Sequence, residues 1–200
     1  MSFLAEGSPV VLGSANPKKA AELVEILGSR IEVVPRPLEI PEIIEDADTF
    51  EGNARLKALA ISEATSMAAL ADDSGLMVDA LDGQPGVHSA RYSGENATDS
   101  DNVSKLLAEL VEAGAMSSAQ RRARFHSVIV LRRPDGAEVV AKGTVEGTIS
   151  LVPTGEGGFG YDPVFVPLEG DGRTFGEMTA AEKHAMSHRG RALEELVAQL

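Results

Sequence analysis

The sequence contains no cysteine, which excludes disulfide bonds, thiolate metal sites and a thiol nucleophile. It also has no long hydrophobic run, since no segment approaches the roughly 20 apolar residues that a membrane-spanning helix needs. The opening segment MSFLAEGSPVVLGS lacks the basic region and the apolar core of a signal peptide. We therefore expect a cytoplasmic protein that has no membrane partner.

Basic residues are scarce as well. The chain has 18 lysines and arginines against 31 aspartates and glutamates, which gives a net charge of −13. A protein that binds duplex DNA or RNA through its phosphates needs a broad basic surface, so we expect no nucleic-acid partner. An anionic ligand would need cations that are concentrated locally or supplied by a metal. The positions of the few lysines and arginines are therefore informative.

Apolar runs typical of buried strands alternate with segments of helical spacing. The strand patterns cover residues 8–14, 31–35, 67–71 and 76–81. The helical patterns cover residues 20–28, 49–67, 102–114 and 187–200, and Thr98 or Asp99 can cap the third of them. Residues 123–149 form a clear hairpin about the turn RPDG. This pattern predicts an α/β fold with helices flanking a central mixed sheet.

Two adjacent carboxylates, Asp72 and Asp73, directly follow the predicted strand at 67–71. Burying charge at the end of such a segment is costly unless a cation or hydrogen bonds compensate it. The simplest interpretation is a turn in which Asp73 makes a hydrogen bond toward Gly75. The functional interpretation places the pair at the carboxyl end of a strand in an open α/β sheet, where ligands usually bind. A carboxylate there can hold Mg²⁺, and the acidic segment 35–48 could supply a second ligand.

Two short motifs point to other functions. The DSG segment at 73–75 matches the signature of an aspartic protease, whose carboxylate pair a symmetric dimer could form. The many predicted helices disagree with the all-β fold of such a protease, so this stays a minor alternative. Gly155, Gly157 and Gly160 satisfy G-x-G-x-x-G, but a strand pattern follows them where a dinucleotide-binding fingerprint requires a helix. We therefore expect no dinucleotide site.

Several basic side chains lie at positions where a bound anion would stabilise them. Lys18 and Lys19 lie at the start of a predicted helix, where positive charge opposes the helix dipole. Lys57 lies in the mostly apolar stretch ARLKALA, so either its stem packs on apolar surface or its ammonium points at a phosphate chain. Farther along, the donors of SHRG (187–190) could form a purine pocket with Phe159 and Asp162 of the glycine-rich loop TGEGGFGYD (154–162).

Six segments resemble successive blocks of the inosine triphosphate pyrophosphatase family, the XTP/dITP diphosphatases. These segments are SANPKK, FEGNARLKA, ADDSGLMVDAL, PGVHSARYSG, GGFGYDPVF and AEKHAMSHRGRAL, and they run in order from about residue 10 to 196. The resemblance implies that residues 1–200 form a single two-lobed domain around a mixed sheet, and that the protein is a homodimer. It also implies Mg²⁺-dependent hydrolysis of ITP, dITP and XTP to the monophosphate and pyrophosphate.

The resemblance also implies roles for individual residues. Asp73 would be the general base and a metal ligand, Lys57 would be a second catalytic residue, and Glu45 would be the second metal ligand, although Glu42 is close enough to take that place. The implied substrate-binding residues are Ser14, Ala15, Asn16, Pro17, Lys18 and Lys19 in a triphosphate loop, Ser74, and then Phe159, Gly160, Tyr161, Asp162, Lys183, His188 and Arg189. Ala15 and Pro17 stand where relatives often carry glycine or a flexible residue.

Two questions remain open from the sequence: how the purine base is selected, and whether the protein hydrolyses the nucleotide or only binds it. His188 and Arg189 are donors that suit the C6 carbonyl of inosine or xanthosine better than the amino group of adenosine. A sister enzyme that acts on other modified nucleotides, or a regulatory module that binds nucleotides without turnover, would carry similar residues. Release of pyrophosphate from ITP separates the enzyme from the binding module.

Overall fold

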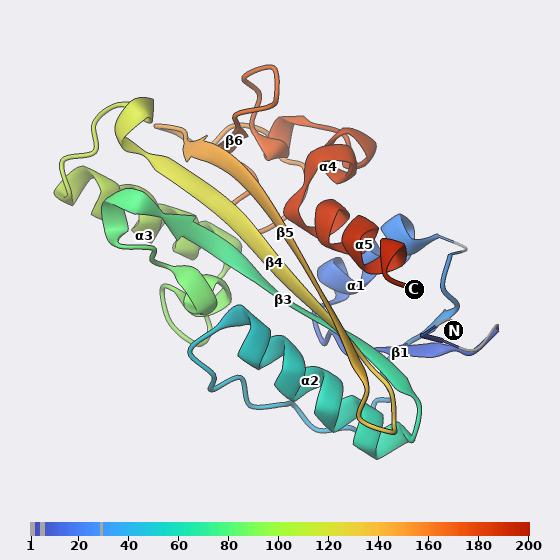
Figure 1. Ribbon diagram of the computed structural model, residues 1–200. Helices are drawn as coiled ribbons and strands as arrows, with labels where there is room; N and C mark the ends of the chain where they lie inside the picture. The colour runs from blue at the N-terminus through green and yellow to red at the C-terminus, as the bar shows by residue number, and fades with distance from the viewer. Residues whose placement is uncertain (1–2, 5–6, 29) are drawn as a thin grey trace. The chain divides into compact units, whose positions relative to one another are not determined.

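The computed structural model describes residues 3–4, 7–28 and 30–200, which form a mixed six-stranded sheet with flanking helices (Figure 1). The strands are β1 (Val10–Leu12), β2 (Val33–Val34), β3 (Ala68–Val78), β4 (Arg122–Arg132), β5 (Glu138–Ile149) and β6 (Phe165–Pro167). The helices are α1 (Pro17–Leu27), α2 (Phe50–Thr65), α3 (Asp99–Glu112), α4 (Ala180–Met186) and α5 (His188–Ala198). The sheet order is β2-β1-β3-β4-β5-β6. The predicted α/β class is confirmed.

The sheet combines both pairing modes. Strand β1 pairs in parallel with β2 and with β3, whereas β5 and β6 are antiparallel. The predicted hairpin at 123–149 is confirmed as β4 and β5, and its turn is closed by the Arg133 N–H, which donates to the Ala137 carbonyl at 2.8 Å. Within the described ranges, no helix combines the length and the apolar character needed to cross a bilayer.

The chain divides into two compact units. The first contains the described part of residues 1–73 together with Ser127–Gly143 and Arg189–Leu200, and the second contains Ser74–His126 and Thr144–His188. Strands β3, β4 and β5 each contribute residues to both units.

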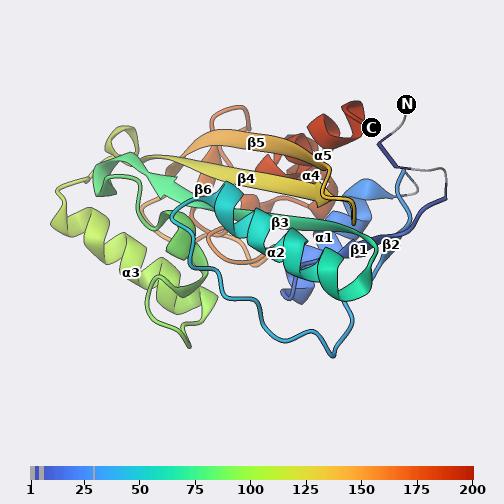
Figure 2. The same cartoon turned by 60° about the horizontal axis from the view of Figure 1, so that its bottom comes forward.

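The pleat of β3 sorts the core of the first unit into two layers. Successive side chains on a strand point to opposite faces. Ala68 and Leu70 accordingly belong to a cluster with buried residues of α1 and α5, such as Leu23 and Leu193. The intervening alanines of β3 pack against α2 instead, which runs alongside β3 (Figure 2). The two faces of the strand therefore have different neighbours, and this decides the surroundings of the residues that follow.

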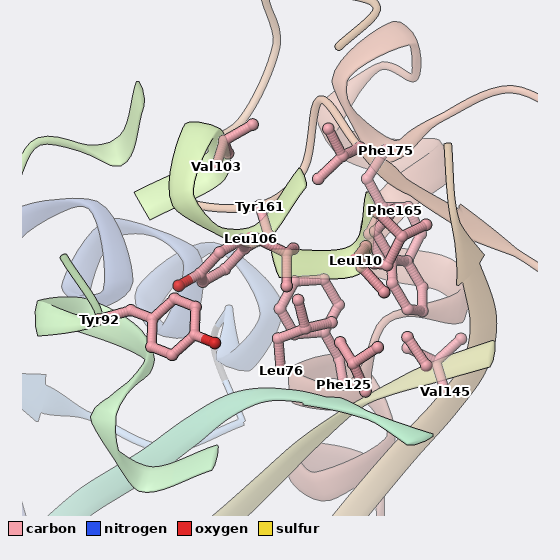
Figure 3. Close-up of a cluster of buried hydrophobic side chains, with 14 of the residues drawn as sticks. Leu76, Tyr92, Val103, Leu106, Leu110, Phe125, Val145, Tyr161, Phe165 and Phe175 are labelled. Carbon is pink, nitrogen blue, oxygen red and sulfur yellow. The ribbon is translucent and has the colours of Figure 1, made fainter. Parts of the chain in front are cut away.

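The second unit has its own aromatic core, drawn in Figure 3. The ring of Phe165 lies 4.7 Å from that of Phe125 and 5.2 Å from that of Phe175, measured between centroids. Leu106 and Leu110 of α3 belong to this cluster (Figure 3). Helix α3 begins at a reciprocal cap between Thr98 and Asp101, so Thr98 is the cap among the two predicted candidates.

The structure corrects three details of the predicted elements. The aspartate pair does not end a strand or form a turn, because β3 continues through Asp72 and Asp73 to Val78. The pattern at 76–81 is therefore no separate strand: its first half completes β3, and Asp79–Leu81 form a 3₁₀ helix. The strand predicted at 31–35 is reduced to the two residues of β2. The first correction matters most, since it changes where the carboxylates lie.

Candidate active site

The site begins where β1 stops and its neighbour continues. Parallel pairing ends with Leu12 opposite Leu70, and the Gly13 N–H then donates to the Leu70 carbonyl at 2.7 Å. Beyond this point β3 continues to the aspartates, while the segment after β1 turns away from β3 and leads into α1. The carboxylates thus lie next to the carboxyl end of a parallel strand, which is the predicted kind of location, but the strand that ends is β1.

Asp72 is on the α1 and α5 face of β3, and it is enclosed by cations. Its carboxylate lies 3.4 Å from the Arg189 Nε and 3.9 Å from the Lys19 Nζ, and its side chain has no exposed surface. Arg189 also binds the Glu22 carboxylate. Burial alone would raise the pKa of Asp72, but the charges of Lys19 and Arg189 lower it to about 2. Asp72 is therefore ionised at neutral pH and acts as the counter-charge of these cations.

Asp73 faces α2 and has a different environment. Its Oδ1 lies 3.2 Å from the Lys57 Nζ, and its Oδ2 accepts a hydrogen bond from the Asn53 amide at 3.3 Å. Burial raises the pKa of Asp73 despite the opposing charge of Lys57. The pKa values of Asp72 and Asp73 are thus pushed in opposite directions, which is typical of carboxylates with separate tasks. Asp73 is the better proton acceptor.

The ammonium of Lys57 also binds the acidic arm, which we define as residues 35–48. Glu45 Oε2 lies 3.0 Å from the Lys57 Nζ, so this ammonium connects Glu45 with Asp73. Burial opposes the charge of Lys57, but the surrounding carboxylates outweigh it and raise the pKa. Glu42 lies elsewhere, along an apolar groove of about 870 Å³ that α1, β2 and the arm border. Of the two glutamates, Glu45 is the one that contacts this cluster.

Two carboxylates that share one cation are chemically suited to Mg²⁺. Both offer hard oxygen donors, and Mg²⁺ in nucleotide enzymes is usually held by one or two carboxylates together with waters and substrate phosphates. Across residues 3–4, 7–28 and 30–200 there is no cluster of three or more histidine, aspartate or glutamate side chains placed to hold a metal by themselves. The oxygen donors of Asp73 and Glu45 therefore fit the ligand preferences of Mg²⁺.

The predicted triphosphate loop is held by the cap of α1. The Asn16 Oδ1 accepts hydrogen bonds from the backbone N–H groups of Lys18 at 2.9 Å and Lys19 at 3.2 Å. Pro17 occupies the first helical position, where a missing N–H costs nothing and the ring favours the helical φ. Ala15 is exposed, as are Asn16, Pro17 and Lys18. The departure from the family at Pro17 is thus compatible with a well-formed helix start.

In the second unit, the glycine-rich loop folds around Asp162. This carboxylate accepts hydrogen bonds from the Lys183 ammonium at 2.7 Å and from the Phe159 N–H at 2.8 Å. The ammonium also lies 4.8 Å from the centre of the Phe159 ring. Gly158 has φ +71°, and a Cβ there would collide with the Asp162 carboxylate. The loop therefore presents a half-buried ring that is fixed by a buried ion pair.

Two other predicted site residues of the second unit, Tyr161 and His188, are buried. Tyr161 belongs to the aromatic core, and its hydroxyl donates to the Ser89 carbonyl at 2.9 Å (Figure 3). The His188 ring stacks on Phe125 with centroids 4.6 Å apart, and only 3% of the residue is exposed. Ser74, half-buried, follows the aspartate pair on β3. Tyr161 thus connects the glycine-rich loop to the aromatic core of the second unit.

Sequence reasoning missed two members of this arrangement. Asn53 binds Asp73, and its position four residues before Lys57 in FEGNARLKA is the signal that could have revealed it, since such residues share one helix face. Glu22 binds Arg189, and it lies three residues after Lys19 on α1. No pattern in the sequence joins Glu22 to Arg189, because they are far apart along the chain.

The chain combines an α/β fold with a buried cluster of carboxylates and cations around Asp72 and Asp73. The Ham1 family model matches residues 10–199. The dITP/XTP pyrophosphatase of Symbiobacterium thermophilum is 45% identical over 192 residues, which cover 96% of this chain and 94% of that protein. The dITP/XTP pyrophosphatase of Streptomyces avermitilis is 46% identical over 193 residues, 94% of each chain.

A solved structure is also similar to this chain. A HAM1 protein from Coxiella burnetii is similar with a TM-score of 0.86 and 42% identity, over 96% of this chain and 97% of that one. The chain belongs to the Ham1 family. The resemblance predicted from six short segments is confirmed, and the names of the relatives agree with the predicted class of enzyme.

The buried charges around Asp72 lead to a prediction about stability. We expect Asp72→Asn to lower the free energy of unfolding at pH 7 by about 3 kcal/mol, because it removes a carboxylate from the enclosed cations Arg189 and Lys19. Urea unfolding followed by circular dichroism measures this change. Asp135→Asn is the control, since Asp135 pairs with Arg133 at the exposed hairpin turn, where an ion pair contributes less than about 1 kcal/mol. Equal stabilities of the two variants would contradict the importance of the network.

Proposed function

We propose that this chain hydrolyses ITP, dITP and XTP to the corresponding monophosphate and pyrophosphate. The observation that carries the proposal is the Asp73 carboxylate, which is buried, has a raised pKa and is held by Lys57 and Asn53. The family relatives named dITP/XTP pyrophosphatase support the substrate class. Cleansing the nucleotide pool of these purines would be the role of such an enzyme.

The proposed reaction is a displacement at the α-phosphorus. Asp73 accepts a proton from a water molecule while the water oxygen bonds to the α-phosphorus, and the bond from that phosphorus to the oxygen bridging the α- and β-phosphates breaks. Lys57 keeps the Asp73 carboxylate in place through its 3.2 Å contact. Its ammonium also contributes positive charge near the substrate. The raised pKa makes Asp73 a stronger base than an ordinary aspartate.

Asp73 and Glu45 are the residues that we propose to hold Mg²⁺. When bound, this ion neutralises the charge that develops on the pyrophosphate leaving group. Glu45 is one-third exposed and Asp73 is nearly enclosed, so the pair can present oxygens at the edge of the buried cluster. Lys57 binds both carboxylates and so holds them near each other.

We propose different tasks for the residues of the two units. In the first unit, the loop Ser14–Lys19, in which residues 15–18 are exposed, binds the phosphates through its lysines. In the second unit, Phe159 stacks on the purine, and Lys183 and Asp162 keep that ring in place. Ser74, Gly160, Tyr161, His188 and Arg189 complete the proposed substrate-binding set. Arg189 binds Asp72 and Glu22, so its removal would also disturb the charge network.

A substrate panel tests the proposal. We expect kcat/KM for pyrophosphate release to be at least about tenfold higher with ITP, dITP or XTP than with ATP. The C6 amino group of adenine would face the donors of His188 and Arg189 without an acceptor, and a buried donor in that position costs roughly 1–3 kcal/mol. Phe159→Ala should lower kcat/KM for all four substrates by a similar factor, since stacking on the ring does not depend on the C6 group. Binding of ITP without pyrophosphate release would favour the regulatory module instead. Equal kcat/KM for ATP and ITP would contradict the proposed selectivity.

Three further features stay predictions. The resemblance implies a single two-lobed domain over residues 1–200 and a homodimer, and the composition favours a cytoplasmic location. Sedimentation of the purified protein measures its oligomeric state. These features are independent of the assignment of Asp73.

A further inference from the structure

Asn53 is an enclosed polar side chain that connects Asp73 with the acidic arm. Only 1% of the residue is exposed. Its Oδ1 accepts the Ala47 N–H at 3.0 Å, and its Nδ2 donates to the Asp73 Oδ2 at 3.3 Å. A backbone N–H can only donate, so the orientation of the amide is determined: oxygen toward the arm and nitrogen toward Asp73. Asn53 thus satisfies both neighbours at once.

Lys57 makes the same kind of connection one helical turn later. It binds the Asp73 Oδ1 at 3.2 Å and the Glu45 Oε2 of the arm at 3.0 Å. Asn53 and Lys57 are four residues apart and therefore share one face of α2. We call these two side chains the α2 clamp. Each oxygen of Asp73 has one clamp residue, and each clamp residue also binds the arm.

Gly52 is a second, independent indication that the arm packs closely against α2. A Cβ at this position would lie 2.6 Å from the Cβ of Ala47, which is closer than two carbon atoms can approach. Glycine is otherwise unfavourable within a helix. Its backbone N–H is used at the helix start, where it donates to the Thr49 Oγ1 at 3.0 Å. The missing side chain lets the arm reach Asn53.

We infer that Asn53 is a positioning residue, which holds the arm and Asp73 at the separation that lets Glu45 and Asp73 act on one Mg²⁺ ion. This inference rests on the proposed function and adds a residue to it. Lys57 alone cannot set the separation, because a lysine side chain is long and flexible, whereas the short amide of Asn53 is bound on both sides. Side chains that orient metal ligands commonly change metal affinity or activity by 10–100-fold when they are removed.

The experiment compares three variants in turnover and in backbone amide exchange of the arm. Asn53→Ala should lower kcat by 10–100-fold and raise the half-saturating Mg²⁺ concentration about tenfold, with KM for ITP at saturating Mg²⁺ changed less than threefold. Amide exchange over residues 35–48 should rise in the substrate-free protein. Gly52→Ala should reproduce the faster exchange and the weaker response to Mg²⁺, because the new methyl group displaces the arm.

Asn53→Asp separates the two contacts of the amide. The new carboxylate keeps an acceptor for the Ala47 N–H but faces the Asp73 carboxylate without a donor. We expect exchange of the arm to stay near the parental rate while kcat falls as much as in Asn53→Ala. A merely structural role would slow turnover and speed exchange together in all variants.

Arg55→Ala is the matched control for weakening of α2. Arg55 lies on the same helix but pairs with Glu51 and Glu138, outside the clamp. Parental kcat or parental arm exchange in a folded Asn53→Ala protein would overturn the inference, and so would an equal effect of Arg55→Ala. If the parent protein releases no pyrophosphate from any nucleotide, the proposed function fails, while unchanged exchange of the arm in Asn53→Ala alone would refute its positioning role.

Discussion

Asp73→Asn is expected to lower kcat for ITP by about a thousandfold or more, which corresponds to roughly 4 kcal/mol of lost transition-state stabilisation. The new amide has nearly the size of the carboxylate, so the strand and its neighbours can stay in place. It cannot accept a proton from water, and it offers a metal only one weak oxygen. One substitution therefore removes both proposed tasks of Asp73. Single-turnover kinetics with saturating ITP and Mg²⁺ measure the loss.

The control for this variant is Asp79→Asn. Asp79 pairs with Arg124 at a partly exposed position, and its change should leave kcat within about twofold. Urea unfolding of both proteins verifies that the loss of turnover in Asp73→Asn does not come from unfolding. If a folded Asp73→Asn protein turns over ITP at a near-parental rate, Asp73 is not the base and the proposed mechanism fails.

Removal of divalent metal has the second large expected effect. EDTA should reduce pyrophosphate release to the background rate, and added Mg²⁺ should restore it. Zn²⁺ should not substitute, because the chain has no cysteine and the described residues form no cluster of three or more metal-ligating side chains. Full activity in the presence of chelator, or recovery with Zn²⁺ alone, would contradict the assignment of Asp73 and Glu45.

Glu45 and Glu42 can be separated in the same assay. Glu45→Gln should raise the half-saturating Mg²⁺ concentration by tenfold or more, because Glu45 shares the Lys57 ammonium with Asp73. Glu42→Gln is the matched control on the same arm. It lines the apolar groove instead, so its Mg²⁺ dependence should stay parental. The opposite order of effects would move the proposed ligand to Glu42.

Local patterns predicted most of the fold correctly. The loop after the first strand, the helix capped by Thr98 and the hairpin β4–β5 all follow from short-range rules of turn and cap chemistry. The prediction that a strand ends at the aspartate pair was wrong for a long-range reason. Polar residues normally end a buried strand, but here Lys57 and Arg189 compensate the two charges. Those cations come from distant segments, so no local pattern shows them.

The site was predictable by resemblance to a family more than by spacing. Family blocks pointed to Asp73, Glu45 and Lys57, and the structure brings these three side chains together. The contacts of Asn53 are different in kind, since they depend on a backbone N–H of the arm. The spacing of Asn53 and Lys57 could have revealed the contact with Asp73, but a main-chain partner leaves no mark on the sequence, so the contact of Asn53 with the arm could be inferred only from geometry.

The alternating faces of β3 have a consequence for insertions and deletions. Asp72 and Asp73 are chemically identical, and only the count of residues from the pairing with β1 assigns one to the cations of α1 and α5 and the other to α2. A deletion of one residue between Ala68 and Asp72 would turn Asp72 toward α2 and Asp73 toward α1 and α5, and would put Ser74 at the position from which Asp73 contacts Lys57. An insertion at the exposed turn 134–137 would preserve both. Length variation among functional variants of this chain should therefore be absent from 68–73 and permitted at that turn.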